Sequence, residues 1–177
     1  EYGPKANSYA IQALGGHGYI NEHPVEMLYG DNRLNAIHEG TTGIQSLDLI
    51  ARKVPMNNMK GYLATISEMN KAIETAKDIA SLKEFSAQLA SAVNLLNSTT
   101  EAVLKDMSTK NIDLALANSV SYLSMFGHVI IAWLWLKQGI VASNALAEHS
   151  HKDDEHFYQG KLQALQYFYR IELPQVT

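Results

Sequence analysis

Apolar residues recur at intervals of three and four along most of the chain, which is the spacing of one face of an α-helix. Two such stripes predict helices over about residues 56–73 and 85–107. The first stripe contains Met56, Met59, Tyr62, Leu63, Ile66, Met69 and Ile73. The second stripe contains Phe85, Leu89, Ala92, Val93, Leu96, Val103 and Met107. A last helix, predicted from about Asp154 to Glu172, carries Phe157, Leu162, Leu165, Phe168 and Tyr169.

The stretch from Leu114 to Leu136 contains no charged residue. A membrane span needs about 20 predominantly apolar residues, whereas the longest unbroken apolar run here is the eight residues from Val129 to Leu136. We therefore expect no transmembrane segment but a central, mostly buried helix, with Trp133 and Trp135 packed against neighbouring helices or a subunit interface. Because no alternating strand pattern competes, the predicted fold class is all-α, an antiparallel bundle of four amphipathic helices.

Polar residues at three-residue spacing predict where some of the helices begin. Ser81 with Glu84, and Thr42 with Gln45, fit the capping box, in which two side chains satisfy free N–H groups at a helix start. Asn111 is predicted to begin another helix. The chain itself starts within a helical pattern, so we expect it to be the C-terminal part of a longer protein. The apolar residues of this N-terminal helical pattern are Tyr2, Ala6, Tyr9, Ala10, Ala13 and Leu14.

Proline and glycine divide the sequence near Pro55. Residues 56–173 contain no proline, and seven of the eleven glycines precede Pro55. Helix interiors exclude proline and disfavour glycine, so long helices are expected after residue 55 and helices broken by tight turns before it. The predicted domains are accordingly residues 1–54 and 55–177.

Composition narrows the class of protein. With 46% hydrophobic residues, 18% charged residues and a net charge of −4, the chain has the profile of a soluble globular protein. The acidic balance argues against a nucleic-acid partner, which needs a basic surface. The absence of cysteine excludes disulfides, thiol nucleophiles and cysteine-ligated metals. No signal segment is evident at the start, and we expect a bacterial cytoplasmic location.

Histidines are the remaining metal-ligand type. His149, His151 and His156 lie beside acidic residues, but neither an HExxH motif nor the spacing of structural zinc sites is present. We expect no metal, and a solvated loop leading into a helix instead.

Three segments before Pro55 stand out chemically: QALGGHGY at 12–19, HPVEMLYGDNR at 23–33 and IHEGTTGIQ at 37–45. The paired glycines can end a helix with a left-handed residue, or admit the backbone close to a large ligand. They do not form the GxGxxG pattern after a strand, so a Rossmann site is excluded. Glu39 and Gly40 fall just before a predicted helix start, where free N–H groups attract an anion, but spacing alone does not make Glu39 a catalyst.

Taken together and in this order, the three segments resemble the C-terminal end of the acyl-CoA dehydrogenase family. The family pattern is approximately Q-x-x-G-G-x-G-Y, then P-V-E-x-L-x-R-D-A-R, then I-Y-E-G-T-x-x-I-Q. This resemblance covers about residues 1–54. The rest resembles the extra helical domain of larger bacterial-type members, whose ending is similar to the segments Phe157–Lys161 and Leu173–Pro174.

The resemblance implies an FAD-dependent enzyme that oxidises an acyl-CoA thioester to the trans-2-enoyl-CoA. In such enzymes the α proton goes to a base and the β hydrogen goes as hydride to the flavin. Electron-transferring flavoprotein is the implied electron acceptor. A carboxylate is a weak base in water, and burial against an apolar acyl chain raises the pKa of a carboxyl group toward the useful range.

The resemblance also implies roles for individual residues. Glu39 matches the catalytic carboxylate, and Gly40 matches a position next to the substrate. Flavin-contacting positions after the base match Thr41, Thr42 and Gly43. The segment that approaches the FAD of a neighbouring subunit matches Gln12, Ala13, Leu14, Gly15 and Gly16, which makes a homo-oligomer part of the expectation.

Two positions depart from the pattern, because His38 replaces the usual Tyr and Gly30 replaces a frequent Arg. Two alternatives also stay open: a helical assembly domain without chemistry of its own, and an acyl-CoA oxidase that returns electrons to oxygen. We expect the 177-residue chain to be inactive by itself, because the resemblance places most of the flavin and substrate sites in preceding sequence. Acyl chain length is not predicted.

Overall fold

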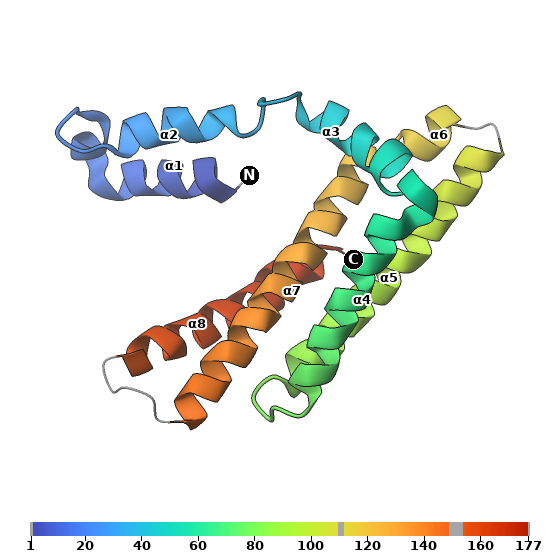
Figure 1. The fold of residues 1–177 in the computed structure, drawn as a ribbon. Coiled ribbons are helices and arrows are strands. Elements are labelled where there is room, and N and C mark those ends of the chain that lie inside the picture. Colours follow the sequence, from blue (N-terminus) through green and yellow to red (C-terminus); the bar gives the residue numbers. More distant parts are fainter. Residues whose placement is uncertain (1, 110–111, 149–153, 177) are drawn as a thin grey trace. The chain divides into compact units, whose positions relative to one another are not determined.

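A computed structural model describes residues 2–109, 112–148 and 154–176, and every regular element in these ranges is a helix. The predicted all-α fold class is therefore confirmed. The chain divides into two compact units, Glu1–Ser46 and Leu47–Thr177, whose helices are labelled in Figure 1. This division lies eight residues before the predicted domain boundary at residues 54 and 55. The predicted boundary stays a prediction.

The first unit is a helical hairpin. Helix α1 (Tyr2–Leu14) is followed by the 3₁₀ turn η1 (Gly15–Tyr19) and packs against α2 (Val25–Leu34). Gly15 ends α1 with φ +59°, which is the predicted left-handed stop. Gly18 brings the turn against α1, since a Cβ there would lie 2.8 Å from the carbonyl oxygen of Ile11.

Apolar side chains of the first unit remain on its surface. Among described residues 2–46, only Gly18 and Ser46 are buried, so this hairpin has no apolar core of its own. The exposed large apolar residues are Tyr2, Tyr9, Leu14, Tyr19, Ile20, Met27, Leu28, Tyr29, Leu34, Ile37 and Ile44.

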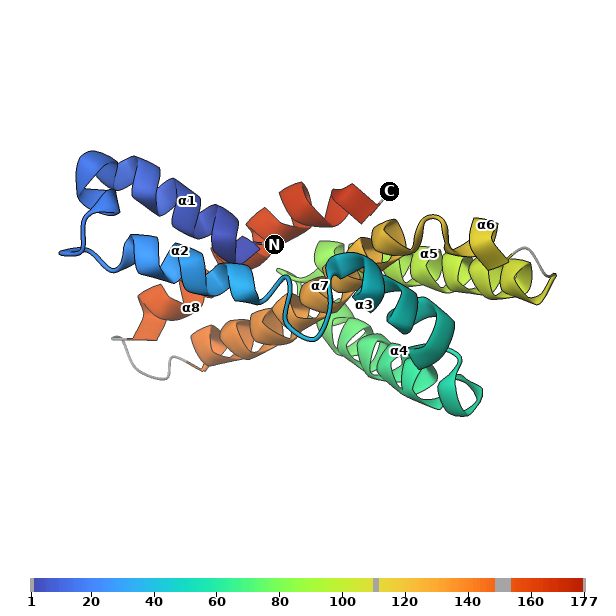
Figure 2. The same ribbon diagram turned by 90° about the horizontal axis from the view of Figure 1, so that it is seen from above.

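The second unit begins at Leu47, within helix α3 (Thr42–Asp48), and continues into a π-helical turn η2 (Leu49–Lys53). Two helical hairpins follow: α4 (Met56–Lys77) with α5 (Lys83–Ser108), and α7 (Ser119–Ala147) with α8 (Glu155–Tyr167). The short α6 (Ile112–Leu116) precedes α7, and the turns η4 (Phe168–Glu172) and η5 (Leu173–Val176) complete the unit. Both views show the two hairpins (Figures 1 and 2).

Helix α7 joins the hairpins, because it packs against α4, α5 and α8. The predicted central position of this helix is thus confirmed, but the prediction that it is mostly buried is wrong. It is buried along one face, and Leu134 and Val141 are 44% and 62% exposed. Helix α7 is long and apolar enough to cross a membrane, but the core helix of a soluble protein also meets these two criteria. Trp133 and Trp135 pack against the core as predicted. The buried residues of α7 are Ser119, Tyr122, Met125, Val129, Ala132, Leu136, Gly139 and Ala142.

Gly139 allows α7 to pack closely against neighbouring side chains. A Cβ at this position would lie 2.5 Å from Cδ1 of Leu165 on α8 and 3.2 Å from Cδ2 of Leu82 before α5. Both leucines are fully buried. The glycine therefore lets α7 meet α8 and the α4–α5 connection at one point.

The predicted capping boxes are wrong. Helix α5 begins at Lys83 with Leu82 as its N-cap and no capping side chain, because burial of Leu82 in the core fixes the helix start. Ser81 instead lies 3.3 Å, Oγ to Oγ, from Ser143. Helix α3 begins at Thr42, so Thr42 is its first residue and not its cap. Asn111 lies outside the described residues.

The start of α4 departs from regular helix geometry. Asn57, Asn58 and Met59 all have positive φ, near +53°, +56° and +62°, a conformation that costs about 1–2 kcal/mol per residue other than glycine. This left-handed turn separates Met56 from the buried stripe, and Met56 is exposed. From Tyr62 onward the predicted stripe is buried, with Leu63 as the exception.

Candidate functional site

The candidate catalytic residue lies in the turn between α2 and α3. The carbonyl oxygen of Leu34 accepts bonds from the N–H groups of Ile37 and His38, at 3.0 and 2.8 Å. The chain then passes through Glu39 with φ +58° and Gly40 with φ +124°. A left-handed glutamate costs about 1–2 kcal/mol. Such conformations persist only where surrounding contacts impose them, and they cluster at functional sites.

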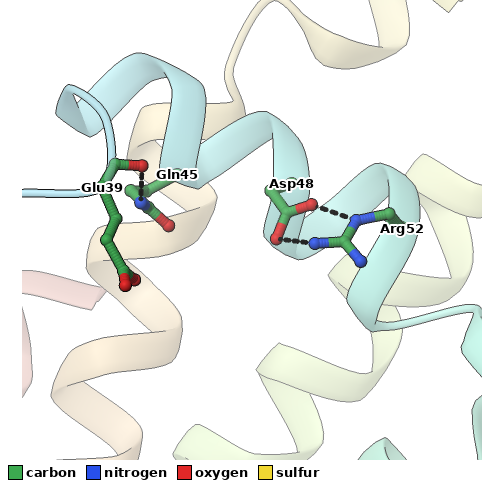
Figure 3. A network of polar contacts seen from close by, with 4 residues as sticks. All are labelled: Glu39, Gln45, Asp48 and Arg52. Atoms are coloured by element: carbon green, nitrogen blue, oxygen red, sulfur yellow. Dashed lines mark hydrogen bonds and ion pairs between the residues drawn. The ribbon is translucent and has the colours of Figure 1, made fainter.

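Gln45 supplies such a contact. Its side-chain Nε2 donates a hydrogen bond of 2.8 Å to the carbonyl oxygen of Glu39 (Figure 3). Its own backbone N–H donates to the carbonyl of Thr41 at 3.0 Å, which fixes Gln45 within the first turns of α3. The helix therefore holds the backbone of the turn that precedes it.

The carboxylate of Glu39 is free of this contact. Figure 3 shows it extending away from the bond between its own carbonyl and Gln45. Its side chain is 80% exposed, and the imidazole Nε2 of His38 lies 4.0 Å from Oε1. An ion pair at this distance between two exposed groups contributes little. The backbone of Glu39 is thus fixed while its carboxylate stays accessible to a ligand.

Gly40 cannot carry a side chain without strain. Its φ of +124° is unfavourable for L-residues, and a Cβ would lie 3.2 Å from Cγ2 of Ile44 and 3.5 Å from Nε2 of Gln45. The absence of a side chain lets Ile44 and Gln45 pack against the turn beside Glu39.

The residues predicted to contact the flavin form two groups. Thr41 directly precedes α3, which begins with Thr42 and Gly43. The other group, Gln12–Gly16, comprises the end of α1 and the start of η1. These groups lie at opposite ends of α2 (Figure 1), whose ten residues span about 15 Å. The structure therefore does not bring the two groups together within the chain.

Both groups fit a large polar cofactor. A Cβ at Gly15, Gly16 or Gly43 would meet no atom within 4 Å, so the backbone there is open. Thr41 is exposed and Thr42 is half-buried, and each carries a hydroxyl. Accessible backbone groups and hydroxyls are the donors that a cofactor with many oxygen and nitrogen acceptors requires.

The two residues that depart from the family pattern, His38 and Gly30, have different surroundings. His38 is 68% exposed beside Glu39. Gly30 lies within α2 with open space where a Cβ would stand, and Arg33 lies in the last turn of that helix.

Sequence reasoning missed two polar contacts near the turn, both drawn in Figure 3. One is the Gln45 bond, and the other is the ion pair of Asp48 with Arg52, in which Nη2 donates to Oδ2 at 2.8 Å. Hydrogen bonding from Arg52 lowers the pKa of Asp48, and the same bond raises the pKa of Arg52. The four-residue spacing could have predicted this pair, whereas no spacing rule predicts a side chain that reaches back to a turn carbonyl.

A cavity is present in another part of the chain. It has a volume of about 670 Å³, belongs to the second unit and is lined by parts of α5, α6, α7 and η5. None of the predicted site residues lines it. Of the three histidines weighed as metal ligands, His149 and His151 lie outside the described residues. Elsewhere in the described chain, no three metal-binding side chains gather.

Comparison with protein families assigns both parts of the chain. Residues 4–54 match the family described as acyl-CoA dehydrogenase, C-terminal domain. Residues 65–177 match the family described as acetyl-CoA dehydrogenase C-terminal like.

Individual relatives agree with these matches. The broad-specificity linear acyl-CoA dehydrogenase FadE5 of Mycobacterium tuberculosis is 27% identical over 95% of this chain and 28% of its own length. A butyryl-CoA dehydrogenase of Syntrophomonas wolfei is 32% identical over 94% of this chain and 27% of its own length. The mitochondrial short-chain specific acyl-CoA dehydrogenase of Rattus norvegicus is 55% identical over 38 residues, 22% of this chain and 9% of its own length.

The chain thus spans less than a third of the length of the relatives that match nearly all of it. Since family matches cover most of its residues and relatives of the same name align along it, the chain belongs to the acyl-CoA dehydrogenase family of oxidoreductases.

Proposed function

We propose that this chain is the C-terminal part of an FAD-dependent acyl-CoA dehydrogenase, in which Glu39 removes the α proton of a fatty acyl-CoA thioester. The observation that carries the proposal is the turn at Glu39. An accessible carboxylate stands on a left-handed backbone that Gln45 holds, next to a glycine whose φ of +124° the turn requires.

The chemistry asks two things of the protein. An α proton beside a thioester is weakly acidic, so it needs a carboxylate placed within reach and polarisation of the thioester carbonyl. Glu39 supplies the carboxylate and takes the proton on Oε1 or Oε2. Gly40, which matches a family position next to the substrate, would lie beside the thioester. FAD, when bound, accepts the β hydrogen as hydride.

The two predicted flavin-contacting groups serve different copies of the chain in this proposal. Thr41, Thr42 and Gly43 contact the flavin that works with Glu39. Gln12–Gly16 contact the FAD of a neighbouring subunit. Their separation along α2 supports this assignment, and it makes a homo-oligomer necessary for a complete site.

The test uses the full-length protein that carries this chain. It is purified with its flavin, mixed without oxygen with saturated acyl-CoAs of increasing chain length, and followed by flavin absorbance. We expect bleaching with at least one substrate and formation of the matching trans-2-enoyl-CoA. The 177-residue chain by itself serves as the control and is expected to leave the substrates unchanged.

A full-length protein that binds no flavin and converts no acyl-CoA would overturn the proposal and favour a helical assembly domain. The electron acceptor is tested on the same reduced enzyme. We expect rapid reoxidation by electron-transferring flavoprotein and slow reoxidation by oxygen. The reverse order would identify an acyl-CoA oxidase.

A further inference from the structure

We infer that Gln45 is a positioning residue for the reaction: its side-chain amide holds the backbone of Glu39 in the conformation that aims the carboxylate. This inference rests on the proposed function of Glu39. The side-chain amide of Gln45 contacts the backbone carbonyl oxygen of Glu39, and Gln45 therefore acts through Glu39.

The contact ties a turn to a helix. Gln45 lies six residues after Glu39, is half-buried, and is anchored by its own N–H bond to Thr41. Its Nε2 reaches back over Gly40 to the Glu39 carbonyl at 2.8 Å. One side chain thus closes a loop whose other bonds are local, including a longer bond of 3.4 Å from the N–H of Gly40 to the carbonyl of Ile37.

The backbone of Glu39 needs such a restraint. With φ +58° it occupies a region that glutamate seldom visits, and a hydrogen bond to its carbonyl fixes the peptide plane that follows it. If this residue relaxed to negative φ, its Cα–Cβ bond would turn and the carboxylate would move by several ångströms. Displacements of about 1 Å already cost a large part of the rate in reactions that depend on alignment.

Gly40 permits the turn that the amide holds. Its φ of +124° strains an L-residue, and a Cβ there would lie 3.2 Å from Cγ2 of Ile44. The glycine and the glutamine therefore act together: the first permits the turn, and the second maintains it.

The experiment compares two variants with a matched control in the full-length protein. Gln45→Ala removes the amide, and Gln45→Glu keeps its length but replaces the N–H donor by a carboxylate at neutral pH. The control is Gln159→Ala, because Gln159 makes a similar exposed bond of 2.9 Å to Glu155 on α8.

Two readouts separate positioning from simple structural support. We expect both Gln45 variants to lower the maximal rate of flavin reduction at least tenfold, while the acyl-CoA concentration for half-maximal rate changes less than twofold. In the protein without substrate, we expect faster amide hydrogen exchange in residues 38–41 of both variants. Gln159→Ala should match the wild type in both measurements.

The possible results are distinct. If Gln45→Ala and Gln45→Glu reduce flavin at the wild-type rate while Glu39→Gln does not, the positioning role is wrong and the proposed function stands. If substrate affinity, rate and thermal stability of the Gln45 variants fall together, Gln45 only supports the fold and the inference is overturned. If Glu39→Gln reduces flavin normally, the proposed function itself fails.

Discussion

At the scale of single residues, the site depends on backbone geometry more than on side-chain charge. Glu39 has an exposed carboxylate, a weakly paired histidine neighbour and a left-handed backbone. The resemblance to a family pattern predicted Glu39 as the catalytic carboxylate. It did not predict the positive φ or the Gln45 contact, because a hydrophobic pattern reports which face is buried and carries no information on a turn dihedral.

Tyr122 gives a residue-scale prediction about alkaline pH. Burial raises the pKa of this phenol to about 12, and its hydroxyl lies 2.8 Å from Oγ1 of Thr100. Because the folded pKa exceeds the unfolded value of about 10, the stabilising effect is complete below pH 10 and is lost as pH rises toward 12. We expect the free energy of unfolding to fall in this window by at most about 1.4 kcal/mol per pH unit from this group.

The measurement is urea unfolding of the wild type and Tyr122→Phe between pH 8 and 12. The wild type should lose stability more steeply than the variant above pH 10. Parallel curves would show that Tyr122 ionises equally easily in the folded and unfolded chain.

At the scale of elements, helix faces follow the sequence pattern and helix ends do not. The α5 stripe from Phe85 to Leu96 and most of the α4 stripe are buried as predicted, because burial of apolar side chains determines which face turns inward. Val103 and Met107 of the α5 stripe are half-buried. The start of α5 is set by the buried Leu82 and not by the hydroxyl of Ser81. At the start of α4, three left-handed residues interrupt a pattern that assumes a continuous helix.

The close packing at Gly139 predicts that a large side chain at this position destabilises the fold. Gly139→Leu would force its side chain into Leu165 and Leu82, both fully buried. We expect a loss of about 1–3 kcal/mol in the free energy of unfolding. Gly160→Leu is the control, since a Cβ at that position on α8 meets no atom within 4 Å. Equal stability of the two variants in urea unfolding would contradict the packing described at Gly139.

The left-handed turn of α4 predicts that an Asn→Gly substitution stabilises the chain at residue 58 and destabilises it at residue 70. Asn58→Gly relieves a positive φ and is expected to stabilise the chain by about 0.5 kcal/mol, since asparagine already tolerates this region. Asn70→Gly, in the exposed interior of the same helix, is expected to destabilise it by up to about 1 kcal/mol. Thermal unfolding of both variants tests this, and a loss of stability at both sites would argue for a regular helix at residues 57–59.

At the scale of the whole molecule, the two units differ in what stabilises them. The second unit has a continuous apolar core contributed by α4, α5, α7 and α8, whereas the hairpin of residues 2–46 buries no large apolar side chain. The change in glycine and proline content predicted a boundary in this part of the chain. The absence of a core before it could not be predicted, because exposed and buried helix faces have the same periodicity.

This difference predicts independent folding of only one unit. Residues 47–177, expressed alone, should be helical and unfold in a single cooperative transition, because their core is complete without the hairpin. Residues 1–46 alone should show little helix, since short isolated helices are marginal in water. Circular dichroism of the two pieces checks both expectations. A stably folded hairpin, or an unstructured 47–177, would contradict the division of roles.

The central claim is that Glu39 removes the proton, and its most direct test is the rate of flavin reduction in the full-length protein. Wild type, Glu39→Gln and the exposed control Glu22→Gln are mixed without oxygen with a saturating acyl-CoA, and substrate binding is measured separately. General base catalysis typically contributes about 10²–10⁴-fold. We predict that Glu39→Gln binds the substrate and reduces flavin at least 100-fold more slowly, while Glu22→Gln matches the wild type. Equal rates for Glu39→Gln and the wild type would contradict the account.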